Sequence, residues 1–414
     1  MINRPTMWRS LALLAAAATG VAACSSSSSS SVAAGSSSGG GSSSGGSSGG
    51  GSAKCAAGLE IGFFGALTGD SANLGINEDN GLKLALQQFN KANPGCQVKD
   101  VPFDSAGDPA QAPGLAIKAV GDAKLVGLVG PAFSGESKAA DPTFNDAGLP
   151  TITASATNVT LSTNGWKIFH RAVGTDAAQG GAVANYLTHD LSAKKVALID
   201  DASEYGKGIA GVVKAKIGGA VAITDEIDPK GTDFSSTVSK IKGANVDAVF
   251  FGGYYQAAGV LAKQLHDAQV SAKFIAPDGS EDPGFVKAAG NDAAEGAILT
   301  APAAPINVVQ GGADFQSAYK AASGADVGLY SVEAYDAANI FLDAIRTAPP
   351  RARQSTTTWA QRPTSRACRS TISSTTKASC RAPSPSMPIP SRTGPSSASS
   401  RSTPDSTSAG GVLA

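Results

Sequence analysis

The chain has 414 residues, of which 42 % are hydrophobic, and its 33 basic and 33 acidic side chains give a formal net charge of zero. That zero hides two unlike parts, because residues 347–414 carry eight Arg, one Lys and a single acid, a net charge of +8. Residues 1–346 therefore carry −8, which argues against nucleic acid as a partner.

The first 54 residues indicate export. Residues 1–23 combine Arg4 and Arg9 with a short apolar run and small residues before Cys24, a pattern typical of a secretory signal peptide rather than a membrane span. A Cys directly after small residues resembles the lipobox of bacterial lipoproteins, which implies that Cys24 is lipidated. The alternative is an ordinary secretory signal with an incidental Cys. The Ser/Gly-rich stretch over 24–54 favours the lipoprotein, because an anchored domain needs a flexible tether; we expect a lipid anchor on the outer face of the cell membrane.

Beyond the tether, 55–414 is too long for one ordinary core and suits two domains. Short apolar runs alternate with amphipathic stretches, and this alternation predicts parallel sheets covered by helices on both faces. A break near 171–176 indicates the passage from one domain to the next. The expected strands fall in two series, 59–64, 98–103, 125–129 and 150–153, then 196–199, 221–227, 248–251 and 273–276.

Helical patterns lie between these runs. Leu82, Leu86 and Phe89 share one face of a predicted helix, as do Val238 and Ile241 in another. A further helix is expected over 330–345, and helix starts are expected at 108–109 and 232–233.

Export permits disulfides, and two cysteines precede neighbouring strands. Cys55 stands just before the run 59–64, and Cys96 just before 98–103. If these are adjacent parallel strands, both cysteines lie at the same edge of the sheet, so we favour a Cys55–Cys96 bridge.

The tail after residue 346 differs from everything before it. It consists mostly of Ser, Thr, Pro, Arg and Ala, and aliphatic periodicity stops directly after a helix that needs partners. One interpretation is a disordered C-terminal extension. We favour a second, a shifted reading frame near codon 346, because GC-rich codons read out of frame often yield these residues. The C-terminal part would then not be native; if neither other frame restores helix and strand patterns downstream of codon 346, this hypothesis is wrong.

Candidate binding residues follow the strands, because ligands of open parallel sheets bind beyond the carboxyl ends of the strands. Hydroxyl groups and the N–H groups at helix starts suit a carboxylate, although Ser134 could equally serve only to cap a helix. A buried acid such as Asp278 suits an ammonium group. The sequence therefore predicts a receptor for a zwitterion, with an α-amino acid as the simplest case. The candidates are Ser134, Ser155, Thr157, Tyr205, Tyr254 and Asp278.

Four motifs, 66–69 (Ala-Leu-Thr-Gly), 104–109, 205–208 and 250–254, resemble those of the leucine/branched-chain amino acid binding proteins, the extracellular receptors of ABC importers. The likeness runs from about 59 to 346. It implies the type I periplasmic-binding fold, an α/β fold of two doubly wound parallel-sheet lobes with a ligand cleft between them. It also implies a monomer that delivers its amino acid to a membrane permease, without metal or cofactor. Lobe 1 would take 55–174 and 303–346, and lobe 2 would take 175–302.

The resemblance also assigns roles. Ser134, Ser155 and Thr157 match the carboxylate-binding positions, Asp278 matches the acid that holds the ammonium group, and Tyr205 and Tyr254 match tyrosines of the second lobe that close over the ligand. Two positions depart from the pattern: Leu74 stands where some members have an aromatic residue, and Asp278 replaces a longer Glu. The family also requires a further helix, a hairpin, a third crossing and a last strand, which the composition of the tail cannot form.

Other functions are less well supported. His170, His189 and His266 are scattered without metal-ligand spacing, and neither a nucleophile elbow nor a dinucleotide fingerprint occurs, so we expect no enzyme. A sensory receptor for a membrane signalling protein stays open, because the same fold serves both purposes. An amide, urea or an aromatic acid stays open as ligand, although Asp278 favours an amine.

Overall fold

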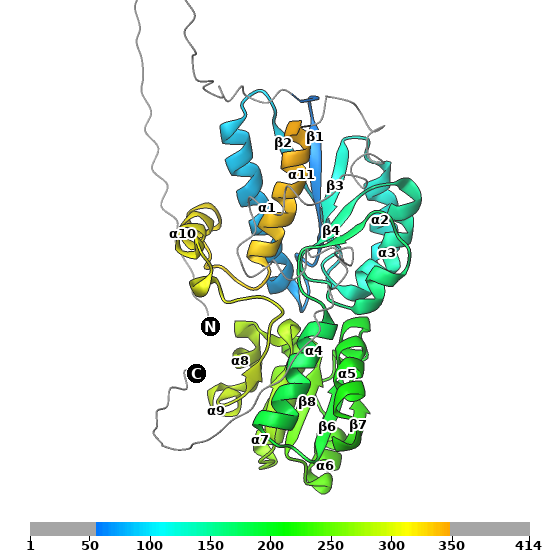
Figure 1. Ribbon diagram of the computed structural model, residues 1–414, viewed down its shortest axis with the longest axis vertical. Coiled ribbons are helices and arrows are strands. Elements are labelled where there is room, and N and C mark those ends of the chain that lie inside the picture. The colour runs from blue at the N-terminus through cyan, green and yellow to red at the C-terminus, as the bar shows by residue number, and fades with distance from the viewer. Residues whose placement is uncertain (1–54, 348–414) are drawn as a thin grey trace, which may run out of the picture. The chain divides into compact units, whose positions relative to one another are not determined.

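The computed structural model describes residues 55–347 (Figure 1). The predicted signal peptide, the lipidation site Cys24, the tether and the tail beyond Thr347 lie outside the described residues. Within 55–347, no helix is both long enough and apolar enough to cross a membrane.

The first sheet has five parallel strands in the order β2-β1-β3-β4-β5. Its side chains alternate between two faces. Ile61 and Phe63 pack with helices α1 and α11 on one face, and Phe64 packs with α2 and α3 on the other. The strands are β1 (Leu59–Gly65), β2 (Val98–Asp104), β3 (Leu125–Val129), β4 (Thr151–Thr153) and β5 (Phe169–Arg171), and the helices are α1 (Ala72–Ala92), α2 (Ala112–Gly121), α3 (Ser134–Ala147), α10 (Gly312–Ser323) and α11 (Ser331–Thr347).

The second sheet also has five parallel strands, in the order β10-β9-β8-β6-β7. Leu198 and Phe250 pack against α4 and α5, whereas Ile199 and Phe251 pack on the opposite face with α6, α7 and α8. The strands are β6 (Val196–Asp200), β7 (Val221–Glu226), β8 (Ala248–Gly252), β9 (Lys273–Ala276) and β10 (Ile298–Leu299), and the helices are α4 (Asp176–Asn185), α5 (Glu204–Ile217), α6 (Ser235–Ala244), α7 (Tyr255–Asp267), α8 (Pro283–Ala289) and α9 (Asn291–Ala294). Short 3-10 turns include η1 (Val159–Thr163), η4 (Asp278–Ser280) and η5 (Ile306–Val308).

The predicted α/β class with two parallel sheets is confirmed, and all eight expected strands are present with ends within one residue of those expected. Two further strands, β5 and β10, were not expected. They are only three and two residues long, and β5 reads Phe-His-Arg, so neither shows the apolar run that marks the others. A short edge strand is defined by its pairing with a neighbouring strand, so its own composition does not reveal it.

Both expected helix starts are wrong by a few residues. Asp108 accepts a hydrogen bond from the Ala110 N–H (2.9 Å) within a turn, and α2 begins only at Ala112. Asp233 likewise accepts from the Ser235 N–H (2.9 Å), and α6 begins at Ser235. Asp side chains stabilise tight turns and helix caps by the same local hydrogen bond, so the residue type does not distinguish them.

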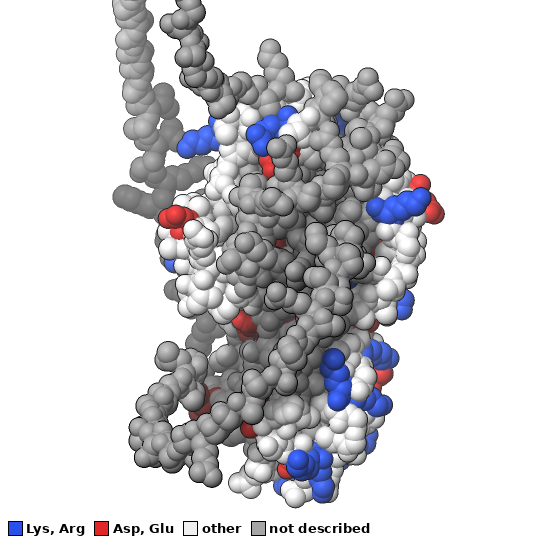
Figure 2. Space-filling model, viewed as in Figure 1, with Lys and Arg blue, Asp and Glu red and all other residues white. Residues whose placement is uncertain are grey.

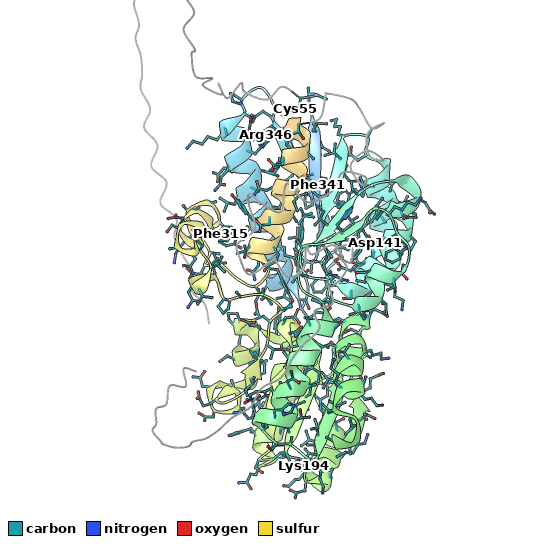
Figure 3. All side chains as sticks on the ribbon, in the orientation of Figure 1. Cys55, Asp141, Lys194, Phe315, Phe341 and Arg346 are labelled. Atoms are coloured by element: carbon teal, nitrogen blue, oxygen red, sulfur yellow. A yellow bond between two sulfur atoms is a disulfide. The ribbon has the colours of Figure 1, made fainter. Side chains whose placement is uncertain are left out.

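The pair of cysteines meets at the amino end of the first sheet. Leu59 of β1 stands opposite Val98 of β2, which brings Cys55 and Cys96 together in a disulfide with a Cα–Cα distance of 4.9 Å. Cys55 and the end of α11 at Arg346 lie at the same end of this layered unit (Figure 3). The opposite, carboxyl ends of the strands carry the site described below.

Two connections between the sheets run side by side. An added Cβ at Gly174, on the first connection, would lie 2.9 Å from both the Cβ and the carbonyl oxygen of Pro302 on the second. Glycine is therefore required by this close approach.

Charged side chains are mixed on the visible described surface (Figure 2). Lys207 pairs with Glu226 at 2.8 Å, and Lys240 pairs with Asp225 at 2.9 Å. Exposed pairs of this kind contribute little stability.

Candidate functional site

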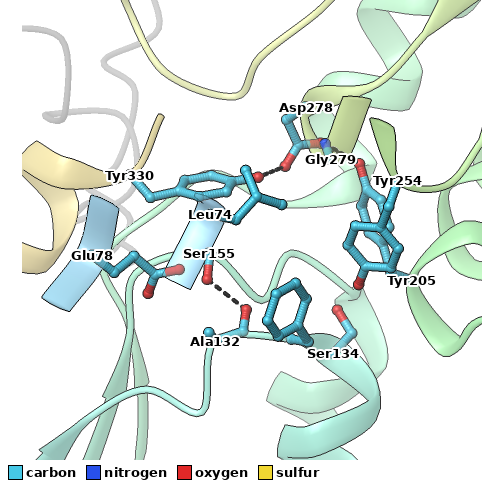
Figure 4. Close-up of a pocket in the computed structure, with 11 residues that line it drawn as sticks. Leu74, Glu78, Ala132, Ser134, Ser155, Tyr205, Tyr254, Asp278, Gly279 and Tyr330 are labelled. Atoms are coloured by element: carbon cyan, nitrogen blue, oxygen red, sulfur yellow. Dashed lines mark hydrogen bonds between the residues drawn. The ribbon is translucent and has the colours of Figure 1, made fainter. Parts of the chain in front are cut away.

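A pocket lies where the carboxyl ends of strands from both sheets meet (Figure 4). The helix α1, the loops after β3 and β4 and the start of α3 contribute to it from the first sheet, and α5, the residue before α7 and η4 contribute from the second. Six of the seven residues predicted to contact a ligand line it. Its lining residues are Leu74, Glu78, Ala132, Phe133, Ser134, Ser155, Tyr205, Tyr254, Asp278, Gly279 and Tyr330.

Asp278 is the acid of the second sheet in this pocket. It begins η4, two residues after the end of β9, and is 0 % exposed. The Tyr205 hydroxyl donates to its Oδ1 at 2.6 Å, and the Tyr330 hydroxyl donates to its Oδ2. Burial raises the pKa of Asp278, and the two phenol hydrogen bonds hold part of that rise back. The arrangement presents a carboxylate whose orientation is set by two tyrosines.

Ser134 lies on the opposite side, at the N-terminus of α3. Phe133 is the cap residue and Ser134 is the first residue of the helix, so the interpretation of Ser134 as a helix cap is wrong. Its Oγ instead accepts a hydrogen bond from the Asn158 N–H at 3.3 Å. The hydroxyl proton of Ser134 therefore stays available for a ligand, beside the N–H groups and the positive end of the helix dipole.

The N-terminus of α3 is held in place by a buried acid outside the pocket lining. Glu136 accepts a hydrogen bond from the Phe133 N–H at 3.2 Å and another from the Ser105 hydroxyl. Burial raises the pKa of Glu136 to about 8. It is a positioning residue, because it determines where Phe133 and Ser134 sit.

Ser155 and Thr157 lie in the loop after β4. The Ser155 hydroxyl donates to the carbonyl oxygen of Ala132 at 2.5 Å, so toward the pocket it offers lone pairs rather than its proton. Thr157 is fully buried but is not among the residues lining the pocket. Its carbonyl oxygen accepts from the Asp176 N–H at 3.0 Å, which ties this loop to the start of α4.

Three aromatic rings form one wall. Tyr254 stacks edge-on against Phe133 with centroids 5.4 Å apart, and lies 5.2 Å from the ring of Tyr205. An added Cβ at Gly279 would lie 2.7 Å from the Tyr205 ring, so only glycine allows the two tyrosines to pack against the η4 backbone. Phe133 belongs to the first sheet's loops and the tyrosines to the second, so this wall joins the two.

Further polar contacts join the same two parts of the chain. Lys138 Nζ lies 2.7 Å from Glu204 Oε2, and Asn158 donates to the Glu204 carbonyl oxygen at 2.8 Å. On the other side of the pocket, the Tyr255 hydroxyl donates to the carbonyl oxygen of Asp70 at 2.5 Å. These contacts lie next in sequence to the pocket-lining residues Tyr205 and Tyr254 and tie them to the first sheet's loops and helices.

Two polar pocket residues were not predicted, Glu78 and Tyr330. Glu78 is four residues after Leu74 on α1 and so shares its face, a spacing that was readable in the sequence. Tyr330 precedes α11 with a φ of +68°, which aims its ring back toward Asp278. The sequence shows no signal for that left-handed backbone, since Tyr rarely adopts it.

Within 55–347, no group of three or more His, Cys, Asp or Glu side chains is placed to hold a metal ion.

Two parallel α/β sheets whose carboxyl ends share a buried polar pocket define a two-lobed binding protein. A family model described as periplasmic binding protein matches residues 58–382, more than half of the chain. The chain belongs to the periplasmic binding protein family, which is a family of solute-binding proteins rather than enzymes. The family expected from the sequence motifs is thereby confirmed.

The chain is similar to several characterised members. It is 32 % identical to the leucine-, isoleucine-, valine-, threonine-, and alanine-binding protein of Pseudomonas aeruginosa over 299 residues, which cover 70 % of this chain and 78 % of that protein. It is 36 % identical to the Leu/Ile/Val-binding protein BraC3 of Rhizobium johnstonii over 249 residues, which cover 59 % of this chain and 67 % of that protein.

Among solved structures, the fold matches the branched-chain amino acid transporter substrate binding protein LivJ from Streptococcus pneumoniae in complex with isoleucine. The TM-score is 0.68 at 28 % identity, covering 74 % of this chain and 88 % of that one.

Proposed function

We propose that this chain is the substrate-binding component of an ABC importer and that it binds a small amino acid, of the branched-chain type, between its two lobes. The observation that carries the proposal is the pairing of a buried carboxylate, Asp278, with the hydroxyl and helix N-terminus at Ser134 across one pocket. These groups complement the ammonium and carboxylate of one α-amino acid. The ligands named for the relatives, and the isoleucine held by the similar structure, support this choice.

In this proposal each group has a distinct task. Asp278 accepts hydrogen bonds from the ammonium group, while Ser134 and the first N–H groups of α3 donate to the carboxylate. Tyr205 and Tyr254 cover the charged end of the ligand, and Leu74 contacts its side chain. The Ser155 Oγ accepts a hydrogen bond from the ligand, and Thr157 supports the loop that carries Ser155.

Delivery requires a membrane permease as partner. We infer that the exported chain stays attached to the outer face of the cell membrane through lipidated Cys24, with 24–54 as a flexible tether and 55–174, 303–346 and 175–302 as the two lobes. Mass spectrometry of the membrane fraction tests the anchor, since lipidation must appear on a peptide that begins at Cys24.

Calorimetry with the full chain tests the ligand class. The panel contains leucine, isoleucine, valine, threonine, alanine, urea, acetamide and benzoate. We expect binding to amino acids only, with a ligand-dependent rise in melting temperature. Binding to urea, acetamide or benzoate in the absence of amino-acid binding would show that the zwitterion proposal is wrong.

A further inference from the structure

Arg171, the last residue of β5, is not among the residues lining the pocket, yet it contacts the loop after β4 that carries two predicted binding residues. Its guanidinium makes three hydrogen bonds. Nε donates to the carbonyl oxygen of Ala156 at 2.7 Å, Nη2 donates to that of Asn158 at 2.6 Å, and Nη1 donates to the Ser162 hydroxyl at 3.0 Å. The guanidinium therefore holds the backbone on both sides of Thr157.

The Arg171 side chain is itself held in place. Its Cζ lies 5.3 Å from the centre of the Phe169 ring, two residues earlier on the same face of β5. Burial lowers the pKa of Arg171 to about 10, and the nearby Asp176 opposes part of this fall. The side chain is therefore a cation at neutral pH. A planar guanidinium can bind two carbonyl oxygens at once in a fixed geometry, which an ammonium group cannot do.

The loop after β4 connects Arg171 to the side of the pocket proposed to hold the ligand carboxylate. Ser155, which lines the pocket, directly precedes Ala156. The Asn158 N–H donates to the Ser134 Oγ at 3.3 Å, so Asn158 also orients the hydroxyl at the start of α3. Two pocket residues, Ser134 and Ser155, thus depend on the two carbonyl groups that Arg171 holds.

The pocket itself contains two acids, Glu78 and Asp278, and none of the described residues that line it is Lys or Arg. A ligand carboxylate there must be stabilised by polar groups. A carbonyl that accepts from a cation polarises its own peptide group, and in a trans peptide the N–H points the opposite way. The hydrogen bond from Arg171 to Ala156 therefore makes the Thr157 N–H, on the side away from the guanidinium, a stronger donor.

We infer that Arg171 is a positioning residue for recognition of the ligand carboxylate: it fixes the loop 155–158 and, through Asn158, the Ser134 hydroxyl. This inference rests on the proposed function, because it requires the ligand carboxylate to lie at Ser134. A binding group loses affinity when the residues that support it become loose. Loss of the guanidinium should therefore weaken the contacts of the carboxylate and leave those of the ammonium group, at Asp278, largely intact.

Leucine and leucinamide test the inference by calorimetry on the full chain at about pH 6, where both amino groups are protonated. The two ligands differ only in the carboxylate, which is a neutral carboxamide in leucinamide. The unsubstituted chain should bind leucine more tightly. Arg171→Met should weaken leucine binding about tenfold and leucinamide binding much less, so that the ratio of the two affinities falls. If another amino acid binds more tightly than leucine, that amino acid and its amide form the pair.

Arg171→Lys keeps the charge and the aliphatic stem but lacks the planar guanidinium. Its affinity ratio should lie between those of the unsubstituted chain and Arg171→Met, and it replaces Arg171→Met in the test if the latter does not fold. The matched control is Arg346→Met, which also removes a guanidinium. Arg346 is exposed at the end of α11, 3.0 Å from Asp343, and lies near Cys55 at the end of the first lobe opposite the pocket (Figure 3). This control should leave the ratio unchanged.

Three outcomes overturn the inference. In the first, the unsubstituted chain binds leucine and leucinamide equally well, a result that needs no variant. In the second, the folded Arg171 variant weakens both ligands by the same factor, as a purely structural role predicts, or weakens neither. In the third, Arg346→Met lowers the ratio as much as the Arg171 variant. If no amino acid binds to the unsubstituted chain, the proposed function itself fails, and this result is distinct from binding with an unchanged ratio.

Discussion

The hydroxyl of Tyr330 donates a hydrogen bond to the carboxylate of Asp278, although 52 residues separate them in the chain. The contact joins the start of α11, which packs on the first sheet, to the end of β9 in the second. Tyr205 donates to the other oxygen, so two hydroxyl groups hold the buried carboxylate of Asp278 in one orientation. The ammonium group of a ligand would therefore meet a carboxylate that is already oriented to accept its hydrogen bonds.

Replacing Asp278 with Ala should abolish amino-acid binding, because the ammonium group would lose its only charged partner in the proposed pose. Breaking a buried ion pair costs about 3–5 kcal/mol, so affinity should fall at least about 100-fold. Asp278→Asn, which keeps the shape, should show most of the same loss. Asp292→Asn, at an exposed position on α9, is the control. Calorimetry that finds affinity retained in Asp278→Ala would defeat the zwitterion proposal.

Tyr330→Phe removes one hydrogen bond from Asp278 while retaining the ring. We expect affinity to fall by about 10- to 150-fold, since a hydrogen bond to a charged group contributes about 1.5–3 kcal/mol. Binding requires ionised Asp278 and is lost as pH falls through its pKa. Because that hydrogen bond lowers the pKa of Asp278, its removal should move the loss of binding to higher pH.

The matched control for Tyr330→Phe is Tyr335→Phe. Tyr335 lies on α11, which begins directly after Tyr330, and its hydroxyl donates to Gln88 at an exposed position, 2.7 Å away. Its affinity and pH profile should match those of the unsubstituted chain. Identical pH profiles for all three proteins would contradict a role of Tyr330 in holding Asp278.

The stability of the ligand-free chain should fall as pH rises from about 5 to about 8. Burial raises the pKa of Asp100 and of Asp176 to about 7 each, and that of Glu136 to about 8. The folded state therefore binds more protons than the unfolded state in this range, so the free energy of unfolding decreases with pH. Each such group contributes a slope of at most about 1.4 kcal/mol per pH unit.

Chemical denaturation at a series of pH values measures this slope. Glu136→Gln should make it shallower between about pH 5 and 8, because it removes the group whose pKa is raised most among these three. Asp233→Asn, at an exposed turn before α6, should leave the slope unchanged. A stability that rises with pH over this range would contradict the assignment of raised pKa values to these buried acids.

Removing the Cys55–Cys96 disulfide should destabilise the chain without weakening ligand binding. The bridge closes a segment with a sequence separation of 41, for which chain entropy predicts about 4 kcal/mol of stabilisation. It lies at the amino ends of β1 and β2, whereas the pocket lies at the carboxyl ends. Denaturation of the double variant Cys55→Ser/Cys96→Ser, with and without reductant, measures the effect. Reductant should lower the stability of the unsubstituted chain only. A loss of ligand affinity in the double variant would contradict the prediction and show that the amino ends of β1 and β2 are coupled to the pocket.

Much of the fold was predictable because it depends on local patterns. Runs such as 125–129 and 248–251 are buried on both faces, so they are rich in apolar residues and stand out from their surroundings. The order of these runs predicts parallel sheets, and the edge on which parallel strands end predicts where polar residues gather. Six of the predicted ligand-binding residues do line one pocket for this reason.

Other features depend on packing between distant elements. The Ser134 hydroxyl faces Asn158 rather than its own helix, and the Ser155 hydroxyl donates to Ala132, because the loops after β3 and β4 are brought side by side by strand pairing. Thr157 has a suitable side chain, yet the turn of the loop places it outside the pocket lining. Residue type indicates a capacity for hydrogen bonding, and only the neighbours determine how it is used.

The sequence by itself determined the class of this protein: alternating apolar runs, the placement of Cys55 and Cys96, and a few motifs were sufficient for two parallel-sheet lobes of a solute receptor. The tertiary structure alone decided the chemistry inside the pocket. Tyr330 reaches Asp278 only through a left-handed backbone and the packing of α11, and Glu78 becomes a fully buried acid only when the surrounding elements exclude water. Burial and contact between distant elements set both pKa and pairing, and neither is a property of a residue in its own segment.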